Sequence, residues 1–530
     1  MKNSLKNHIK NLLLPCLGFS IAAGFLSAIL ATAFKLAAEV VIHASTFLYG
    51  KVATDLRLLA LLVFGSAAVG LIASLILSRS RSCRGGGIPT SVAAIRGIVS
   101  FRWLASIFVL PFSALLTFLC GIPLGTEGPC VQMGTAVGDG VIKCFGKKRH
   151  GGWRRYVMTG GASAGFSVAT GAPISSVLFS IEELHKHFSP MLLTVASVSV
   201  ITSQITVHLL SMLGIGSARL FHLAAIDAIS PKLLFAPLVV GLVCGACSIL
   251  FTRLYNVIDS LMRKALQKIS IKVLFPILFA CVAVVGAMLS YTLGTGHSLV
   301  DTLLRTQVVW YVLILVFLIR AIFMMVANTA GVSGGVFLPT LAFGAIVGSL
   351  CGEAMIAFGW IQPRHYILMV ILGITSFLGS TSRIPVTACV FAVEALGGIN
   401  NILPIIISTT VALLVVELSG LEDFTDTVIE AKVHALNKGQ KPTVVEVPLT
   451  VARDSFAVGK EPKDILWPNS CVVVSFERAA ETRHVIGICE GDIITVHYKT
   501  YHPDVTAGEL AELVGEQSEQ VKSIMLQNNV

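Results

Sequence analysis

Long apolar runs recur along the chain, and they restrict its fold more than any other feature of the sequence. An α-helix needs about 20 mostly apolar residues to cross a bilayer. Runs of about that length or more lie at 56–77, 101–125, 191–216, 233–258, 273–294, 306–331, 337–361 and 400–420. Of the 530 residues, 55% are hydrophobic and 13% charged, whereas a soluble domain is about 25% charged. The sequence predicts an all-α polytopic membrane protein.

Charge divides the chain near residue 431. From there onward the chain has 10 Lys and Arg against 13 Asp and Glu, and the rest has 29 against 16. Basic residues gather between apolar runs, as at 147–155. Such loops favour the cytoplasmic side of a membrane, and they also attract anions. The sequence leaves both interpretations open.

An internal repeat relates two halves of the apolar region. Residues 172–184 (APISSVLFSIEEL) align without gaps to residues 384–396 (IPVTACVFAVEAL), at an offset of 212. Residues 128–138 and 335–348 form a second pair, with Gly134 and Gly138 matching Gly344 and Gly348 at an offset of 210. Two unrelated pairs with nearly one offset predict a duplicated membrane unit. Transporters place their substrate site at the interface of such repeats.

Glycines and prolines interrupt the apolar sequence at 84–89, 121–129 and 331–339. A helix that begins at such a break presents free N–H groups with a partial positive charge, which hold anions without a full cation. The other interpretation is that these glycines only allow close helix packing. Because three breaks are spread over a duplicated unit, we favour an anion site.

Glu127 lies inside one of these breaks, in the stretch LGTEGPCVQMG (124–134). Acidic residues at membrane depth are functional candidates. As a carboxylate, Glu127 competes with an anion for the same N–H groups, and as a neutral acid it leaves them, so it could gate the site and carry a proton. A carboxylate that only caps a helix is the alternative.

Glu182 and Glu183 form a second acidic spot. They point about 100° apart on a helix. Glu182 has Glu394 as its repeat partner, which indicates a structural role, whereas Glu183 is unmatched and is the better candidate for a second proton station. The alternative for Glu183 is an ion pair with Lys186 or His185 at the cytoplasmic edge.

The stretches GGGIP (85–89), GTEGP (125–129) and GGVFLP (334–339) resemble the three signature stretches of the CLC chloride channels and proton-coupled exchangers. The resemblance covers roughly residues 12–430. It implies a homodimer in which each subunit has one anion pathway, built from an inverted repeat of broken helices, with repeats at about 12–216 and 220–425.

The resemblance also implies roles for single residues. Glu127 matches the external gating glutamate of the family, and Glu183 matches the internal proton-transfer glutamate of its exchangers. The anion-binding positions would be Gly85, Gly86, Gly87, Ile88, Val336 and Phe337.

Two departures from the family pattern concern hydroxyl groups. Gly86 replaces the usual serine of the first stretch, and Phe424 is the best match to the pore tyrosine. A site that has neither hydroxyl donor is expected to bind its central anion more weakly and to discriminate less among anions. Chloride is the expected anion, with fluoride and nitrate open.

The pattern changes after about residue 440. Short β-branched runs at 470–478, 483–488 and 492–499 precede a helical pattern at 507–517. We expect a membrane transport domain over 1–435 and a small α/β cytoplasmic domain over 443–530. The latter resembles the TrkA-C subdomain of RCK regulatory modules, which implies dimerisation and an unidentified small-molecule ligand. A domain that only stabilises the dimer is the alternative.

The expected function is chloride/proton antiport in the cell membrane. A passive chloride, fluoride or nitrate channel of the same fold is the first alternative, and a membrane sensor driven by a ligand of the C-terminal domain is the second. An enzyme is not expected, because Walker, HExxH and GxSxG motifs and paired metal ligands are missing from the sequence. We expect no cofactor, metal, disulfide or nucleic-acid partner; the expected partners are the anion, protons, the lipid bilayer and a second copy of the chain.

Overall fold

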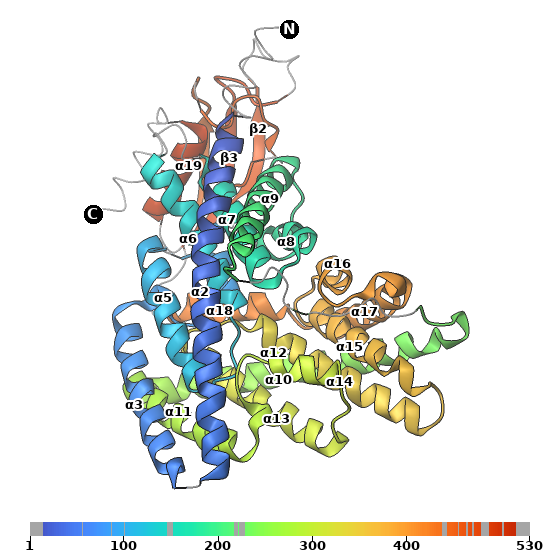
Figure 1. Cartoon of the computed structure of the whole chain (residues 1–530). Coiled ribbons are helices and arrows are strands. Elements are labelled where there is room, and N and C mark those ends of the chain that lie inside the picture. The colour runs from blue at the N-terminus through green and yellow to red at the C-terminus, as the bar shows by residue number, and fades with distance from the viewer. Residues whose placement is uncertain are drawn as a thin grey trace.

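The computed structural model is mostly helical, with a small sheet near the C-terminus (Figure 1). It describes residues 14–55, 57–85, 87–99, 101–145, 152–216, 221, 228–436, 443–453, 455–462, 465–468, 471–478, 487–500 and 503–515. The first half of the membrane part contains α2 (Leu14–Thr54), α3 (Leu58–Arg79), α4 (Ile88–Ile95), α5 (Trp103–Leu119), α6 (Glu127–Phe145), α7 (Arg154–Thr170), α8 (Pro173–Phe179), the π-helical segment η4 (Ser180–His185) and α9 (Pro190–Met212). The second half contains α10 (Phe235–Lys268), α11 (Ile271–Met288), α12 (His297–Leu303), α13 (Trp310–Ala330), α14 (Phe337–Ala357), α15 (Tyr366–Thr381), α16 (Pro385–Ala395), α17 (Ile402–Leu418) and α18 (Phe424–Leu436).

Eight of the described helices are long and apolar enough to cross a membrane: α2, α3, α9, α10, α11, α13, α14 and α17. Large apolar side chains such as Phe64 and Leu250 are exposed on their outer faces, where lipid rather than water is the favourable surrounding. The predicted polytopic membrane fold is confirmed.

One predicted span is shorter than its apolar run. The run 101–125 contains a helix of only 17 residues, α5, which ends at Leu119. Gly121 follows in the left-handed region at φ +69°, a conformation that glycine adopts without strain, and Pro123 lies two residues further on. The rest of the run therefore forms a loop that leads into α6.

The matching glycines of the two halves make matching contacts. A Cβ on Gly134 would lie 2.0 Å from the carbonyl oxygen of Gly161, and one on Gly344 would lie 2.6 Å from that of Gly373. These glycines let α6 approach α7, and α14 approach α15, to backbone contact. The same packing at an offset of about 210 residues supports the duplication inferred from sequence.

Short helices interrupt the membrane part, as expected for broken spans. α8 and α12 have 7 residues each, α4 has 8 and α16 has 11. At about 1.5 Å per residue, none of them crosses a bilayer, so their ends lie within the membrane part of the protein.

The C-terminal region holds β1 (Thr443–Thr450), β2 (Val472–Glu477), β3 (Ile493–Thr500) and α19 (Pro503–Val514). The sheet is antiparallel in the order β1-β3-β2, with Val447 opposite Val496 in the central register. The sequence predicted β2, β3 and the helix, although α19 begins before the expected 507. It missed β1, and the expected run at 483–488 lies mostly outside the described residues.

An aromatic cluster joins this C-terminal region to the start of α7. The Phe456 ring lies 5.3 Å from the Trp153 ring and 5.9 Å from the Tyr156 ring, measured between centroids. Gly152 makes room for it, since a Cβ there would lie 2.3 Å from Phe456. The C-terminal region therefore packs at the end of the molecule where α6 ends and α7 begins (Figure 1).

Polar contacts surround the aromatic cluster. Arg155 pairs with Glu509 of α19, and its second guanidinium nitrogen donates to the Leu466 carbonyl at 3.0 Å. Arg154 lies 3.3 Å from the same Glu509, and the Leu466 N–H donates to the Tyr156 hydroxyl at 3.1 Å. One carboxylate of the C-terminal region, Glu509, thus contacts two basic residues of the membrane part.

Replacing Phe456 with alanine tests this docking. Loss of a buried phenylalanine costs about 3–5 kcal/mol, so we expect Phe456→Ala to release the C-terminal region while the membrane part stays folded. Limited proteolysis in detergent should then cut between residues 436 and 456 much faster than in wild type. Val474→Ala, at an exposed position of β2, is the control, and equal cleavage rates for wild type and Phe456→Ala would contradict the docking.

Candidate functional site

The three Gly/Pro breaks meet at one point inside the membrane part. Gly125 and Gly335 exchange two backbone hydrogen bonds, of 2.6 and 2.8 Å, as an isolated antiparallel bridge. A Cβ on Gly128 would lie 2.6 Å from the Cα of Gly335 and 3.1 Å from the Cα of Gly87. Glycine at these positions lets the three loops touch, so segments predicted separately from the sequence form one centre.

Three helices begin at this centre. α4 starts at Ile88, α6 at Glu127 and α14 at Phe337, and each has a proline within its first three residues. The first N–H groups of a helix have no acceptor within the helix, and proline at such a position removes an N–H that would be unpaired anyway. The converging N-termini create a positive potential without a full cation.

Glu127 is fully buried at the first residue of α6. Its Oε1 accepts a hydrogen bond of 3.3 Å from the Thr126 hydroxyl. Its Oε2 has no hydrogen-bond partner among the described residues, and it lies 2.6 Å from where a Cβ on Gly125 would be. A glycine at 125 is therefore needed to leave this carboxylate its place in the centre.

Glu183 is buried in η4, with 2% of its surface exposed. Its Oε1 accepts a hydrogen bond of 2.6 Å from the Thr425 hydroxyl of α18, and its Oε2 has no partner in the described part of the chain. The proposed station thus has the same arrangement as Glu127, with one oxygen bound to a threonine and one oxygen free. Sequence reasoning missed Thr425, which lies 242 residues away.

Glu182 and Glu394 cap each other's short helices. Glu182 accepts from the N–H groups of Val386 and Thr387 at the start of α16, at 3.1 and 2.7 Å. Glu394 accepts from Ile174 and Ser175 at the start of α8, at 2.8 and 2.9 Å. The prediction of a structural role for this repeated glutamate is confirmed by the reciprocal capping.

Two backbone N–H groups of the loop before α4 donate hydrogen bonds to other parts of the protein. The Gly85 N–H donates to the Gly331 carbonyl at 3.0 Å, and the Gly87 N–H donates to Gln132 Oε1 at 2.7 Å. Gln132 is fixed in turn, because its Nε2 donates to the Ser82 carbonyl and the Ser106 hydroxyl. These two amides are thus occupied in this structure. Gly86 lies outside the described residues.

Phe337 and Phe424 are both buried among aromatic rings. The Phe337 ring meets Phe166 edge-on at 5.0 Å, which holds the first turn of α14 in place. The Phe424 ring meets Tyr255 edge-on at 4.8 Å and is 2% exposed. Val336, the residue before α14, is half-buried.

A tyrosine does lie beside Phe424, although it comes from another helix. Tyr255 of α10 donates its hydroxyl to Asn328 Oδ1 at 2.9 Å. The backbone carbonyl of Asn328 lies next to the Gly85 loop, 3.3 Å from a Cβ built on Gly85. Sequence reasoning missed this pair, and the signal available was a tyrosine and an asparagine inside apolar runs.

Comparison with known proteins identifies the family to which the chain belongs. Residues 65–417, more than half of the chain, match the family model described as voltage gated chloride channel. The chain belongs to this chloride channel family, the CLC family. The matched residues end before α18 and the C-terminal region.

Curated relatives of this CLC chain include transporters. It is 26% identical over 438 residues to the H(+)/Cl(-) exchange transporter ClcA of Vibrio cholerae serotype O1, covering 81% of this chain and 91% of the relative. It is also 26% identical over 377 residues to ClcA of Klebsiella pneumoniae strain 342, covering 69% of this chain and 77% of the relative.

Solved CLC structures share the fold. A slow cyanobacterial Cl-/H+ antiporter superposes with a TM-score of 0.71 at 21% identity, covering 80% of this chain and 99% of that chain. A CLC-type fluoride/proton antiporter gives a TM-score of 0.58 at 20% identity, covering 76% and 95%. The predicted CLC-like fold with broken helices is confirmed.

The reciprocal caps can be separated from transport chemistry by mutation. Removing a capping side chain costs about 1 kcal/mol, so we expect Glu182→Ala and Glu394→Ala to lower the free energy of unfolding in detergent by about 1–2 kcal/mol each. Glu446→Ala, on the exposed side of β1, is the control. Normal proton movement in the reconstituted variants is also expected; its selective loss in Glu182→Ala would contradict a purely structural role.

Proposed function

We propose that this chain exchanges chloride for protons across the cell membrane. The observation that carries the proposal is Glu127, a fully buried carboxylate where three helix N-termini meet, with one oxygen that has no hydrogen-bond partner among the residues described. The curated relatives named H(+)/Cl(-) exchange transporters support it.

Glu127 acts as the external gate and as a proton carrier. As a carboxylate it occupies the positive potential of the helix N-termini and competes with an incoming anion. When a proton binds, the charge disappears and the anion can take that place. Amide groups at helix starts carry only partial charges, so they need not hold the anion too tightly for it to leave.

Glu183 acts as the internal proton station. Like Glu127, it accepts a hydrogen bond from a threonine hydroxyl. A hydroxyl donates to a carboxylate and can also accept from a protonated carboxyl, whereas a backbone N–H only donates. A threonine partner therefore accommodates both protonation states, as a proton carrier requires.

The anion-binding positions are the amides of Ile88, Val336 and Phe337 at the starts of α4 and α14. Gly85 and Gly87 shape the loop beneath them, and Phe424 contributes an aromatic edge. Chloride is the proposed anion, and fluoride and nitrate are the variants to compare, since the hydroxyls expected at positions 86 and 424 are absent from the sequence. A passive channel is the competing proposal, which the same loss of hydroxyls favours.

We assign residues 1–435 to transport and 443–530 to a cytoplasmic domain of TrkA-C type. Basic Arg154 and Arg155 lie where this domain docks, and basic loops favour the cytoplasm. The chain assembles as a homodimer through the faces of α8, α9, α16 and α17, where Ile174 and Val386 are exposed beside the reciprocal caps.

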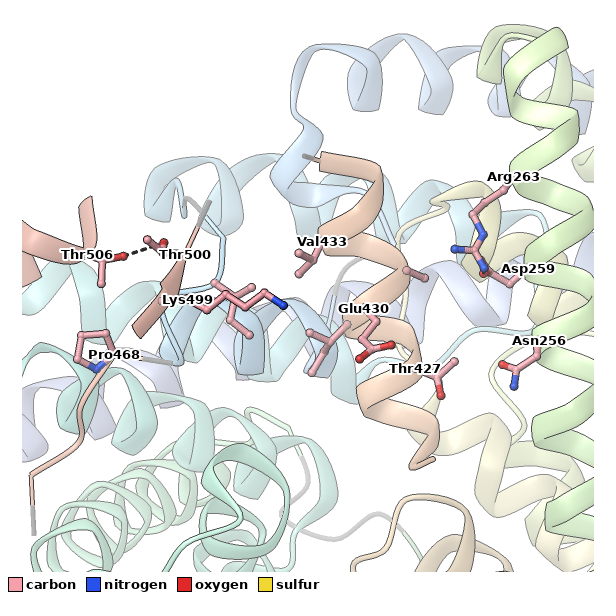
Figure 2. A pocket seen from close by; sticks show the side chains of 14 residues that line it. Asn256, Asp259, Arg263, Thr427, Glu430, Val433, Pro468, Lys499, Thr500 and Thr506 are labelled. Carbon is pink, nitrogen blue, oxygen red and sulfur yellow. Dashed lines mark hydrogen bonds and ion pairs between the residues drawn. The ribbon is translucent and has the colours of Figure 1, made fainter. Parts of the chain in front are cut away.

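Regulation by a polar ligand is a second function, favoured by a cavity of about 530 Å³ between the membrane part and the C-terminal region (Figure 2). Asp259 and Arg263 of α10 form one wall and pair with each other at 2.6 Å. Glu430 of α18 and Lys499 of β3 face the cavity with exposed charges. The size suits a nucleotide. A phosphate of the ligand would lie at Lys499, and a hydrogen-bond donor of the ligand would bind the Glu430 carboxylate.

The first test replaces Glu127 with glutamine, the uncharged isostere. In liposomes with a chloride gradient, we expect wild type to move protons uphill, whereas Glu127→Gln still passes chloride but moves no protons. Chloride and pH electrodes measure both fluxes, and nitrate and fluoride then replace chloride.

Glu39→Gln, at an exposed position of α2, is the matched control and should behave as wild type. Chloride flux without proton movement in wild type would show a channel instead of an exchanger.

The regulatory cavity is tested with adenosine monophosphate as the probe. We expect binding to the full-length protein in calorimetry, at least tenfold weaker binding to Lys499→Ala, and a change in chloride flux when the probe is added on the side of the C-terminal region. No binding, or equal binding to wild type and Lys499→Ala, would contradict a regulatory ligand site in this cavity.

A further inference from the structure

Four charged side chains surround the segment that carries Glu183. Lys186 lies between two carboxylates, 2.5 Å from Asp423, which directly precedes α18, and 2.6 Å from Asp426 of α18. Arg96, which follows α4, lies 3.3 Å from Asp426 and donates to the backbone carbonyls of Glu183 and Leu184 at 3.4 and 3.1 Å. The cluster therefore ties η4 to both α4 and α18.

Asp423 is the member of the cluster most closely linked to Glu183. Thr425 donates its hydroxyl to Glu183 at 2.6 Å and its backbone N–H to Asp423 at 3.0 Å. The Asp423 side chain is 1% exposed, whereas the Asp426 side chain is 38% exposed. Of the two carboxylates that hold Lys186, Asp423 is therefore the one whose charge is less screened by solvent.

The backbone of Lys186 shows that the cluster is held in place. Its φ is +52°, in the left-handed region, which costs an L-residue with a side chain about 1–2 kcal/mol. Such conformations persist where surrounding contacts enforce them and often mark functional sites. Here the two aspartates hold the ammonium at the end of η4.

The charges of the cluster cancel. Arg96 and Lys186 contribute two positive charges, and Asp423 and Asp426 contribute two negative charges. His185, on the same segment, lies with its Nε2 atom 2.7 Å from the Thr159 hydroxyl. Glu182 is engaged with the N–H groups of α16. Glu183 is therefore surrounded by a neutral set of fixed charges.

We propose that Asp423 is a positioning residue for proton transfer, whose negative charge offsets Lys186 and so allows Glu183 to gain and lose its proton. The inference rests on the proposed antiport. When Glu183 binds a proton from the cytoplasmic side, one O–H bond forms and the carboxyl becomes neutral. When the proton moves on toward Glu127, the carboxylate charge returns to Glu183. A net positive cluster would hold Glu183 permanently in the charged state, because opposite charges nearby favour it.

The substitution Asp423→Asn isolates this charge. Asparagine keeps an oxygen that accepts from the Thr425 N–H, but the four neighbours then carry one net positive charge. We expect chloride flux to continue and the ratio of protons to chloride to fall at least fivefold in liposomes.

Asp426→Asn is the matched control. It removes a carboxylate from the same lysine, but at an exposed position where solvent screens the charge, so its ratio should stay within twofold of wild type. The double variant Asp423→Asn, Lys186→Asn restores neutrality, and asparagine tolerates a left-handed backbone; we expect it to recover most of the wild-type ratio. Equal losses in both single variants, or no recovery in the double variant, would overturn the inference.

A second readout does not depend on transport. Infrared difference spectra of the purified protein, referenced to Glu183→Gln, follow the carboxyl C=O band of Glu183 during a pH titration. We expect its midpoint to fall by at least one pH unit in Asp423→Asn and to return in the double variant. An unchanged midpoint overturns the role of Asp423 even if antiport is intact, whereas absent proton flux in wild type overturns the antiport itself.

Discussion

Backbone contact among Gly87, Gly128 and Gly335 is the constraint on which the rest of the membrane part depends. A side chain on any of them would collide with another backbone: a Cβ on Gly87 would lie 2.9 Å from Gly128, and one on Gly335 would lie 2.6 Å from the Gly128 nitrogen. Only because these loops touch do α4, α6 and α14 direct their first turns at a common point. The partial charges of three helix N-termini then add where a single helix would provide a weak site.

The duplicated unit extends this arrangement outward. Gly134 and Gly344 bring their helices into backbone contact with α7 and α15, and Glu182 and Glu394 close the two halves with reciprocal caps. Each half therefore supplies a carboxylate acceptor for a helix start in the other half. The first N–H groups of a helix have no acceptor within the helix, and here the acceptor comes from the repeat partner.

The sequence was sufficient for the features with a local or periodic signal. Apolar runs identified the spans, and glycines and prolines identified the breaks. The ungapped match of Glu182 with Glu394 separated them from Glu183. It was not sufficient for contacts made by folding: Thr425 reaches Glu183 across 242 residues, and Gln132 fixes Gly87 across 45. β1 was missed because Pro448 breaks its pattern, and the strand forms by pairing with β3.

The four glutamates differ in what holds them: two accept from backbone N–H groups at helix starts, and two accept from threonine hydroxyls. Glu182 and Glu394 each accept from two backbone N–H groups, donors that cannot accept a hydrogen bond and therefore stabilise only the charged form. Glu127 and Glu183 each accept from a threonine hydroxyl, and the second oxygen of each has no hydrogen-bond partner in the described part of the chain. A hydroxyl can reverse its role when the carboxyl gains a proton, and the free oxygen is where that proton can bind. For the proposed antiport, this incomplete satisfaction keeps both protonation states of Glu127 and Glu183 within reach.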